Sequence, residues 1–294
     1  TTRYIPKTSF MKFALFPNTC AKAGKPVFEA FRKSLRYHNV WLCENTDLVP
    51  VDIGVMWSVL TNMYGRKPIY DYYKTKVILE VGGLKRNQTW KVAINGINRN
   101  AYFGNTDVDD RRWKQFNFDL RDWRQNGDHI IVCGQNPNSE AWDLPDISQW
   151  WKDVIAQIRK VSDRKIILRP HPRSPVNFKI TEPNVEIQQP KFVGEYDKFN
   201  FVESLKNAWA VVNHNSNPAI EAVMHGIPVF VGESSLCYDV GNHDLSNIED
   251  PLMPDRTKWC NEIAHTEWTV EEIEEGLPLQ RLVPKLEELI NVRQ

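Results

Sequence analysis

The segment Arg-Pro-His-Pro-Arg at 169–173 brings together side chains that suit the binding of a phosphate ester. It follows an apolar Ile-Ile-Leu run, which predicts a buried strand ending in a loop that two prolines stiffen. Arginine offers paired hydrogen-bond donors in a fixed geometry, and an imidazole between two guanidinium groups adds a further donor. We therefore expect Arg169, His171 and Arg173 to bind a phosphate or a diphosphate.

A second polar segment, Asn-His-Asn-Ser-Asn-Pro, follows the apolar run that ends at residue 212. Pro218 suits the first position of a helix, and Asn217 suits the N-cap, where its side chain would accept from amides of the first turn. The positive end of this helix would lie at the carboxyl edge of a parallel sheet, where open α/β sheets bind ligands. We expect an anion site here; an ordinary strand–loop–helix connection is the alternative.

A carboxylate lies near the end of a third apolar run, in the segment Ile-Leu-Glu-Val-Gly-Gly at 78–83. The two glycines allow close approach of the backbone to a ligand. A carboxylate that faces a cleft at this position can take the proton of a reacting hydroxyl group. Glu80 is therefore a candidate general base, and the alternative is a solvent-facing residue before a turn.

The sequence signal for a metal site is weaker than these three signals. Asp107 and Asp109 form an Asp-x-Asp pair, and hard divalent cations prefer oxygen ligands. The pair is followed directly by Arg111 and Arg112, which is more typical of a charged surface loop. The His-Asp pair at 243–244 is equally unspecific, so we expect no bound metal.

Strand-length apolar runs alternate with helical stretches along the whole chain, which predicts parallel α/β sheets. The expected strands are 11–16, 40–43, 51–57, 76–81, 130–133, 165–168, 210–212 and 227–231. The expected helices are 27–37, 147–161, 201–207, 218–225, one that starts at a Thr269/Glu272 capping box, and 282–292.

A chain of 294 residues is long enough for two domains. We expect an N-terminal Rossmann-like domain at 1–145, which strand 130–133 closes before a polar connector at 134–145. A second Rossmann-like domain would occupy 146–275, and a C-terminal helix within 276–294 would pack back on the first.

The composition is that of a soluble globular protein, with 41% hydrophobic and 25% charged residues, and excludes a disordered or fibrous chain. No apolar run approaches the roughly 18 residues of a membrane span, and the opening residues do not resemble a signal peptide. The five cysteines include no Cys-x-x-Cys pair, which argues against a disulfide framework or a zinc site. These observations together favour the cytoplasm.

The formal net charge of zero hides an asymmetry. Residues 1–145 carry 21 Lys and Arg against 14 Asp and Glu, a balance of +7, and the remaining residues have a balance of −7. Cations with interleaved aromatic residues near the start of the chain suit a polyanionic partner. The alternative is solvated surface whose charges happen to segregate.

The segments together resemble bacterial glycosyltransferases of the two-domain GT-B type, particularly the capsular-polysaccharide Kdo-transferase and sialyltransferase group. His171-Pro172 resembles their His-Pro motif, and Ser216 with the helix that leads into Gly-Ile-Pro-Val resembles their donor-site helix. The Gly-Gln pair at 134–135 is similar to the one before the inter-domain linker of the Kdo-transferases.

This resemblance implies an α/β GT-B fold, with two Rossmann-like domains facing each other across a cleft. It implies metal-independent transfer of a sugar from a CMP- or UDP-linked donor, with no further cofactor. The implied donor-binding residues are Arg169, His171, Arg173, Asn215, Ser216, Asn217 and Glu221.

The chain departs from the family at the position of the catalytic base. The family has an acidic pair before glycine, with the base at its second position, and here that position is Val81. Either Glu80 serves from a shifted position, or the base is Asp52, Glu44 or His38.

The acceptor is a separate question. The compact chain also resembles phage glycosyltransferases that modify hydroxymethylated pyrimidine bases in DNA, and we expect that acceptor first, in the host cytoplasm. Candidate acceptor-binding residues are Lys7, Lys12, Lys22, Arg32 and Arg36. The alternatives are an anionic capsular or lipopolysaccharide acceptor with a CMP-Kdo-like donor, a catalytically inactive nucleotide- or glycan-binding protein, and a sugar-nucleotide epimerase of similar fold.

Overall fold

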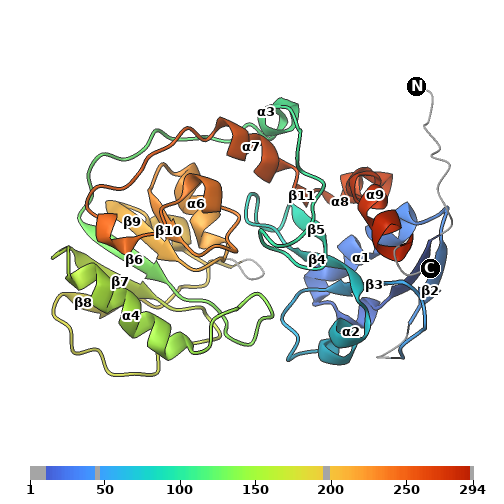
Figure 1. Ribbon diagram of the computed structural model, residues 1–294, viewed down its shortest axis with the longest axis horizontal. Coiled ribbons are helices and arrows are strands. Elements are labelled where there is room, and N and C mark those ends of the chain that lie inside the picture. The colour runs from blue at the N-terminus through green and yellow to red at the C-terminus, as the bar shows by residue number, and fades with distance from the viewer. Residues whose placement is uncertain (1–10, 44–46, 195–198, 292–294) are drawn as a thin grey trace.

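The computed structural model describes residues 11–43, 47–194 and 199–291, and shows two α/β bodies, each built on one sheet (Figure 1). The first sheet has the strand order β11-β5-β4-β3-β1-β2. Its strands are β1 (Lys12–Leu15), β2 (Asn39–Leu42), β3 (Ile53–Trp57), β4 (Thr75–Val81), β5 (Trp90–Ile94) and β11 (Glu267–Trp268). The strands β1 to β4 are parallel, whereas β5 is antiparallel to β4 and β11 is antiparallel to β5.

The second sheet is wholly parallel and has the order β10-β9-β6-β7-β8. Its strands are β6 (His129–Cys133), β7 (Lys165–Arg169), β8 (Val185–Ile187), β9 (Ala208–Asn213) and β10 (Val229–Val231). The central strands are apolar on both faces because helices or loops cover both sides of a parallel sheet.

Helices cover the two sheets and connect their strands. They are α1 (Lys25–Ser34), α2 (Arg66–Tyr72), α3 (Arg111–Phe116), α4 (Ile147–Arg159), α5 (Phe201–Ser204), α6 (Pro218–Met224), α7 (Thr257–Ala264), α8 (Val270–Glu275) and α9 (Leu277–Asn291). Short 3₁₀ turns are η1 (Pro17–Thr19), η2 (Lys22–Gly24), η3 (Tyr238–Val240) and η4 (Leu245–Asn247). Helices α3 and α7 lie beside each other at the top of the view in Figure 1, where the chain passes between the bodies.

The C-terminal helix α9 packs on the first body. Leu279, Leu282 and Leu286 are buried in one cluster with Phe13 of β1 and Phe31 of α1. The capping box that starts α8 is present, because Thr269 and Glu272 bond to each other's backbone amides. The last two helices therefore complete the core of the sheet that the first residues of the chain begin.

Two expectations about the sheets are wrong. Strand 130–133 was expected to close the first half, but it lies at the centre of the second sheet between β7 and β9. The segment 134–145 is therefore not the crossing between the two bodies, since the chain has already crossed before β6. The first sheet is also not purely parallel, because the eight residues between β4 and β5 are too few for a parallel crossover, which needs about a dozen or more.

Gly226 explains the glycine in the Gly-Ile-Pro-Val segment. Its φ is +71°, and a Cβ there would lie far inside contact distance of the Asp122 carbonyl oxygen. We expect Gly226→Ala to lower the free energy of unfolding by about 2–4 kcal/mol, as both backbone strain and a steric clash oppose it. Urea denaturation measures this loss.

Gly194→Ala is the matched control, because Gly194 also has a positive φ (+84°), but no atom of the residues that the structure describes lies within 4 Å of an added Cβ. It should lower the free energy of unfolding by only about 1 kcal/mol, because only the backbone strain of a positive φ opposes it. Equal losses in the two variants would contradict the steric argument.

All five cysteines are buried and free of disulfide bonds, as expected. Within the three ranges that the structure describes, every helix is too short or too polar to cross a lipid bilayer.

Candidate functional site

A cavity of about 350 Å³ lies between the two bodies, at the carboxyl ends of strands from both sheets. Polar residues directly after β7 and β9 line one side, and residues at the end of β4 line the other. The preferred base and the expected donor-binding residues all line it: Glu80, Arg169, His171, Arg173, Asn215, Ser216, Asn217 and Glu221. Parallel sheets bring the ends of their strands to one edge, so residues far apart in the sequence meet here.

Strand pairing places three charged residues in a row on the first sheet. Glu80 of β4 lies directly opposite Lys91 of β5, and Lys91 lies directly opposite Glu267 of β11. Residues that are opposite in antiparallel strands project from the same face. A carboxylate, an ammonium group and a second carboxylate therefore stand side by side on this face of the sheet.

The next row of paired residues along the same strands explains why residue 81 is valine and not the acidic residue of the family. Val81 pairs with Trp90, which pairs with Trp268, and all three are buried in the core under α1, α8 and α9. Because successive side chains of a strand point to opposite faces, an acidic residue at 81 would be directed into this core. The carboxylate that projects toward the second body is that of Glu80, and its Oε1 accepts from the Val81 amide at 2.8 Å.

Lys91 connects the first sheet to the second body. Its side chain is fully buried, and its Nζ donates to Asn217 Oδ1 at 2.9 Å and to the Ile97 carbonyl at 3.3 Å. Burial lowers the pKa of Lys91, and the nearby carboxylates of Glu267 and Glu80 oppose that shift. The contact joins the strand that faces Glu80 to the start of α6.

This contact corrects the expectation for Asn217. The residue stands at the N-terminus of α6 but makes no side-chain cap bond, because its amide oxygen accepts from Lys91 instead. Its main-chain carbonyl accepts from the amide of Ile220 at 2.9 Å. The side chain of Asn217 thus holds the two bodies together rather than closing its own helix.

Glu267 organises the glycine turn after β4. Its carboxylate is completely buried and accepts from the amides of Gly83 at 2.6 Å and Leu84 at 3.0 Å, and from Thr89 Oγ1 at 2.7 Å. A Cβ at Gly82 would collide with this carboxylate. Gly82 is therefore needed for the buried carboxylate to reach the backbone, whereas a Cβ at Gly83 would crowd Asn217 at 3.0 Å instead.

Arg169 is built into the wall of the cavity. It is 4% exposed, and its guanidinium group donates to Gln188 Oε1 at 3.1 Å and to Asn200 Oδ1 at 2.7 Å. Burial lowers its pKa from the usual arginine value, while Glu221 acts in the opposite direction. An arginine held by two amides is pre-oriented for an anion at the end of β7.

His171 has a defined ring orientation. Its Nδ1 accepts from the Arg173 amide at 3.1 Å, and its carbonyl accepts from the Ser174 amide at 2.9 Å. With Nδ1 acting as acceptor, the neutral ring carries its proton on Nε2, which is then the donor that the ring can offer to a ligand.

The loop after β9 is held by a polar network. Asn213 Nδ2 donates to Ser216 Oγ at 2.7 Å, and Asn215 Nδ2 donates to Ser234 Oγ at 2.8 Å. Ser234 Oγ donates to Asp143 at 2.9 Å, and His214 Nε2 bonds to the same carboxylate. Burial would raise the pKa of Asp143, but the hydrogen bonds from His214 and Ser234 outweigh it and the pKa is lowered.

The charged residues that line this cavity favour an anion. Four of them are cations and two are carboxylates: Arg86, Lys91, Arg169, Arg173, Glu80 and Glu221. Residues of the polar segment 134–141, which the sequence predicts to be a connector, form part of the wall. Convergent cations at the carboxyl edge of a parallel sheet suit a phosphate or diphosphate.

The expected acceptor-binding residues do not line the cavity. Lys12 stands at the amino end of β1, about 20 Å behind Glu80 along the strand direction. Arg32 and Arg36 lie at or after the end of α1, at the same distant edge, and Arg32 is paired with Glu29. Lys22 follows the carboxyl end of β1 but does not line the cavity either, and Lys7 lies outside the described residues.

The alternative bases are also remote. Asp52 directly precedes β3 and His38 directly precedes β2, so both lie at the amino edge of the first sheet. His38 packs edge-on against Phe13 at 5.4 Å between ring centroids, and burial lowers its pKa. Glu44 lies outside the described residues. Of the candidates that the structure describes, Glu80 is the one at the cavity.

The aspartate loop does not form a cation site. The Asp109 carboxylate accepts from the Arg111 side chain at 2.6 Å, and this bond lowers the pKa of Asp109. Across the described ranges, no group of three His, Cys, Asp or Glu side chains is arranged to hold a metal ion.

Sequence reasoning missed Lys91, Arg86 and Glu267. A lysine at the second position of an otherwise apolar strand was the available signal for Lys91, because a buried charge in such a run needs a partner. No local pattern marks Glu267, whose partners are 184 residues away in the chain.

Two solved structures have a similar fold. The Thermosulfurimonas dismutans KpsC beta Kdo 2,4 transferase superposes with a TM-score of 0.57 at 13% identity, over 95% of this chain and 98% of that one. The beta Kdo 2,7 transferase of the same organism superposes with a TM-score of 0.54 at 15% identity, over 96% of this chain and 100% of that one. No protein-family profile matches the chain, and no curated protein sequence is detectably similar to it. The likeness confirms the expected fold: two Rossmann-like bodies in the GT-B arrangement, resembling the Kdo-transferase group.

Proposed function

We propose that this protein is a glycosyltransferase that takes a sugar from a CMP- or UDP-linked donor. The observation that carries the proposal is the cavity itself, which Glu80 lines together with four cations: Arg86 and Lys91 from the first body, and Arg169 and Arg173 from the second. The likeness in fold to two Kdo transferases supports it. Five buried, unbridged thiols support a reducing compartment such as the cytoplasm.

In the proposed reaction, Glu80 takes the proton of the acceptor hydroxyl while the acceptor oxygen bonds to the anomeric carbon. The bond between that carbon and the phosphate oxygen breaks, and its electron pair stays with the phosphate. Arg169, His171 and Arg173 would stabilise the negative charge that develops there. Cations suffice for this role, so the proposal includes no metal.

For the acceptor we propose an anionic glycan, with a CMP-Kdo-like donor. The fold likeness to Kdo transferases supports this choice, and so does the position of Lys12, Arg32 and Arg36 at the edge away from Glu80. The basic balance of residues 1–145 still supports DNA with hydroxymethylated pyrimidines as a second candidate.

Mass spectrometry after incubation with CMP-, UDP- and GDP-sugars distinguishes the candidates. Anionic oligosaccharides and hydroxymethylated duplex DNA are offered as acceptors in separate reactions. Sugar added to the oligosaccharide supports the glycan, and sugar added to DNA selects the second candidate. Conversion of the free nucleotide sugar would instead indicate an epimerase. Binding without transfer or hydrolysis would indicate a catalytically inactive nucleotide-binding protein.

The phosphate role of His171 can be measured separately. We expect His171→Ala to weaken CMP or UDP binding by about ten- to a hundredfold, because a hydrogen bond to a charged group is worth about 1.5–3 kcal/mol. Isothermal titration calorimetry gives the dissociation constants. His225→Ala, at the far end of α6, is the control and should bind as the wild type does. Undiminished binding by His171→Ala would refute this assignment.

A further inference from the structure

The contact between Lys91 and Asn217 fixes the direction of an amide group between the two bodies. Lys91 Nζ donates to Asn217 Oδ1 at 2.9 Å. An ammonium group has donors but no acceptor, so the end of the amide that faces it is the oxygen, and the nitrogen points the other way. Lys91 of the first body therefore determines which end of this side chain of the second body is turned away from the first sheet.

The nitrogen end of the same amide is available to a ligand. Among the described residues, no atom accepts a hydrogen bond from Asn217 Nδ2, and this nitrogen is not fully buried. Asn217 lines the cavity between the bodies together with Ser216 and Arg169. An amide nitrogen carries two N–H donors, which suit the oxygens of an anion. The cavity therefore contains a neutral donor in addition to its cations.

The amide of Asn217 is held from a second side. A Cβ added to Gly83 would lie 3.0 Å from Asn217 Cγ, so the backbone of the glycine turn packs against the amide. The Gly83 amide in turn donates to the buried carboxylate of Glu267 at 2.6 Å. Lys91 is itself 1% exposed and also donates to the Ile97 carbonyl at 3.3 Å. Because its neighbours are fixed, the amide loses little conformational entropy when it binds a ligand.

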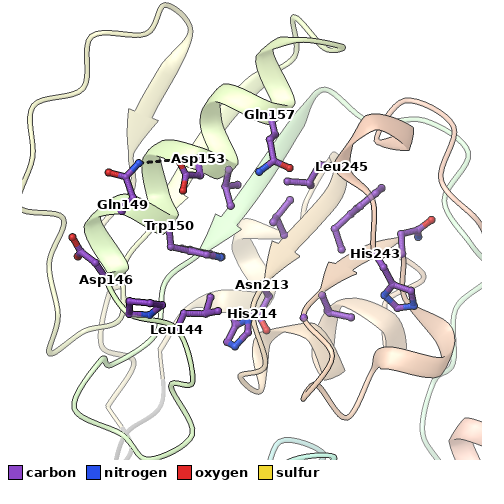
Figure 2. A pocket seen from close by; sticks show the side chains of 17 residues that line it. Leu144, Asp146, Gln149, Trp150, Asp153, Gln157, Asn213, His214, His243 and Leu245 are labelled. Carbon is purple, nitrogen blue, oxygen red and sulfur yellow. Dashed lines mark hydrogen bonds between the residues drawn. The ribbon is translucent and has the colours of Figure 1, made fainter.

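The loop after β9 contributes to two cavities of opposite charge. The second one, of about 490 Å³, lies on the side of the second sheet that α4 covers, and Asn213 and His214 line it (Figure 2). Its described lining has two carboxylates, Asp146 and Asp153, and no lysine or arginine, so it disfavours an anion. Asn217 lines the cavity between the bodies instead, which has four cations. An anion is therefore the ligand that Asn217 Nδ2 would meet.

We propose that Lys91 is a positioning residue for the nucleotide phosphate in the cavity between the bodies. It holds Asn217 Oδ1, so that Asn217 Nδ2 donates to a phosphate oxygen of the donor nucleotide. The two residues belong to different bodies, so tight binding of the donor depends on contact between the bodies. Lys91 also lies opposite Glu80 in the sheet, which connects the phosphate contact to the strand pair that presents the proposed base. The inference rests on the proposed function, because its ligand is the phosphate of a nucleotide.

A double-mutant cycle on the full chain tests this role. Isothermal titration calorimetry with CMP and with UDP gives dissociation constants for the wild type, Lys91→Met, Asn217→Ala and the double variant. Methionine keeps the length of the side chain and removes the ammonium group. We expect Asn217→Ala to weaken nucleotide binding by about tenfold or more, since it removes a hydrogen bond to a charged group. The loss caused by Lys91→Met should be at least about threefold smaller in the Asn217→Ala background than in the wild type, because the lysine acts through the asparagine.

Lys76→Met is the matched control for Lys91→Met. Lys76 is also a buried lysine of the first sheet, but it lies near the amino end of β4, and its Nζ donates to the Tyr73 carbonyl at 2.6 Å. Its removal reports what the loss of a buried ammonium group does to the protein in general. The dissociation constant of Lys76→Met should match that of the wild type within about twofold, because distant sites act independently.

Asn217→Asp tests the amide while Lys91 stays in place. Aspartate keeps an oxygen for Lys91, so the contact between the bodies remains, but it has no nitrogen donor. We expect this variant to weaken nucleotide binding by at least about tenfold. Undiminished binding would mean that Asn217 only joins the two bodies, and would overturn the proposal.

Equal losses from Lys91→Met in the two backgrounds would also overturn it, because a merely structural or purely electrostatic role of Lys91 gives that result. Either outcome, with a wild type that binds CMP or UDP, leaves the proposed function in place. A wild type that binds neither nucleotide would reject the proposed function, and the phosphate role of Lys91 with it.

Discussion

Glu80→Gln is expected to lower kcat by about 10²–10⁴-fold, the usual contribution of a general base. Glutamine keeps the size of the side chain but cannot take a proton from the acceptor. Glu80 projects from the sheet face opposite to the core row that contains Val81, so the substitution leaves that core intact. Steady-state assays with the donor and acceptor identified by mass spectrometry measure kcat.

Two comparisons make this result specific. CMP binding by Glu80→Gln should match that of the wild type within about twofold, because the residues proposed to contact the phosphate, Arg169, His171 and Arg173, belong to the second body. Asp52→Asn removes a carboxylate at the amino edge of the same sheet and should leave kcat unchanged. If Asp52→Asn abolished turnover and Glu80→Gln did not, the base would be misassigned.

Glu267→Ala is expected to lower the free energy of unfolding by about 3–5 kcal/mol. The carboxylate is fully buried, and its loss leaves the amides of Gly83 and Leu84 without their side-chain acceptor. The Thr89 hydroxyl loses its shorter bond and keeps only the one to the Lys85 carbonyl at 3.2 Å. It also removes one of the two carboxylates, Glu267 and Glu80, that lie near the buried ammonium group of Lys91. Urea denaturation followed by circular dichroism measures the difference.

The control for this substitution is Glu275→Ala, at an exposed position in the last turn of α8. It removes the same chemical group and should change the stability by no more than about 0.5 kcal/mol. A loss in Glu267→Ala as small as in Glu275→Ala would show that the buried row contributes little to folding.

Much of the site could be predicted from the sequence because its signals are local. Arg169, His171 and Arg173 follow a strand within five residues, and Asn215 to Asn217 follow another directly. An apolar run that stops at a polar cluster marks the end of a buried strand, whatever the rest of the chain does. Parallel pairing then brings such ends to the same edge, so their meeting in one cavity was foreseeable.

The sheet to which β6 belongs could not be predicted in the same way. Its sequence, His-Ile-Ile-Val-Cys, is that of any buried strand, and its neighbours β7 and β9 are set by pairing across long sequence separations. The same holds for β5, whose antiparallel direction depends on the short turn that Glu267 stabilises from the far end of the chain.

By itself, the sequence determined which segments are strand ends that carry cationic and polar side chains, and that a carboxylate lies at the end of β4. Only the tertiary structure decided that Glu80 faces the cavity while Val81 faces the core, because that depends on the register of β4, β5 and β11. It also decided that Asn217 bonds to Lys91 rather than to its own helix. The physical reason is the same in each case: local hydrophobic patterns are encoded along the chain, whereas the partners of buried charges come from segments that only folding brings together.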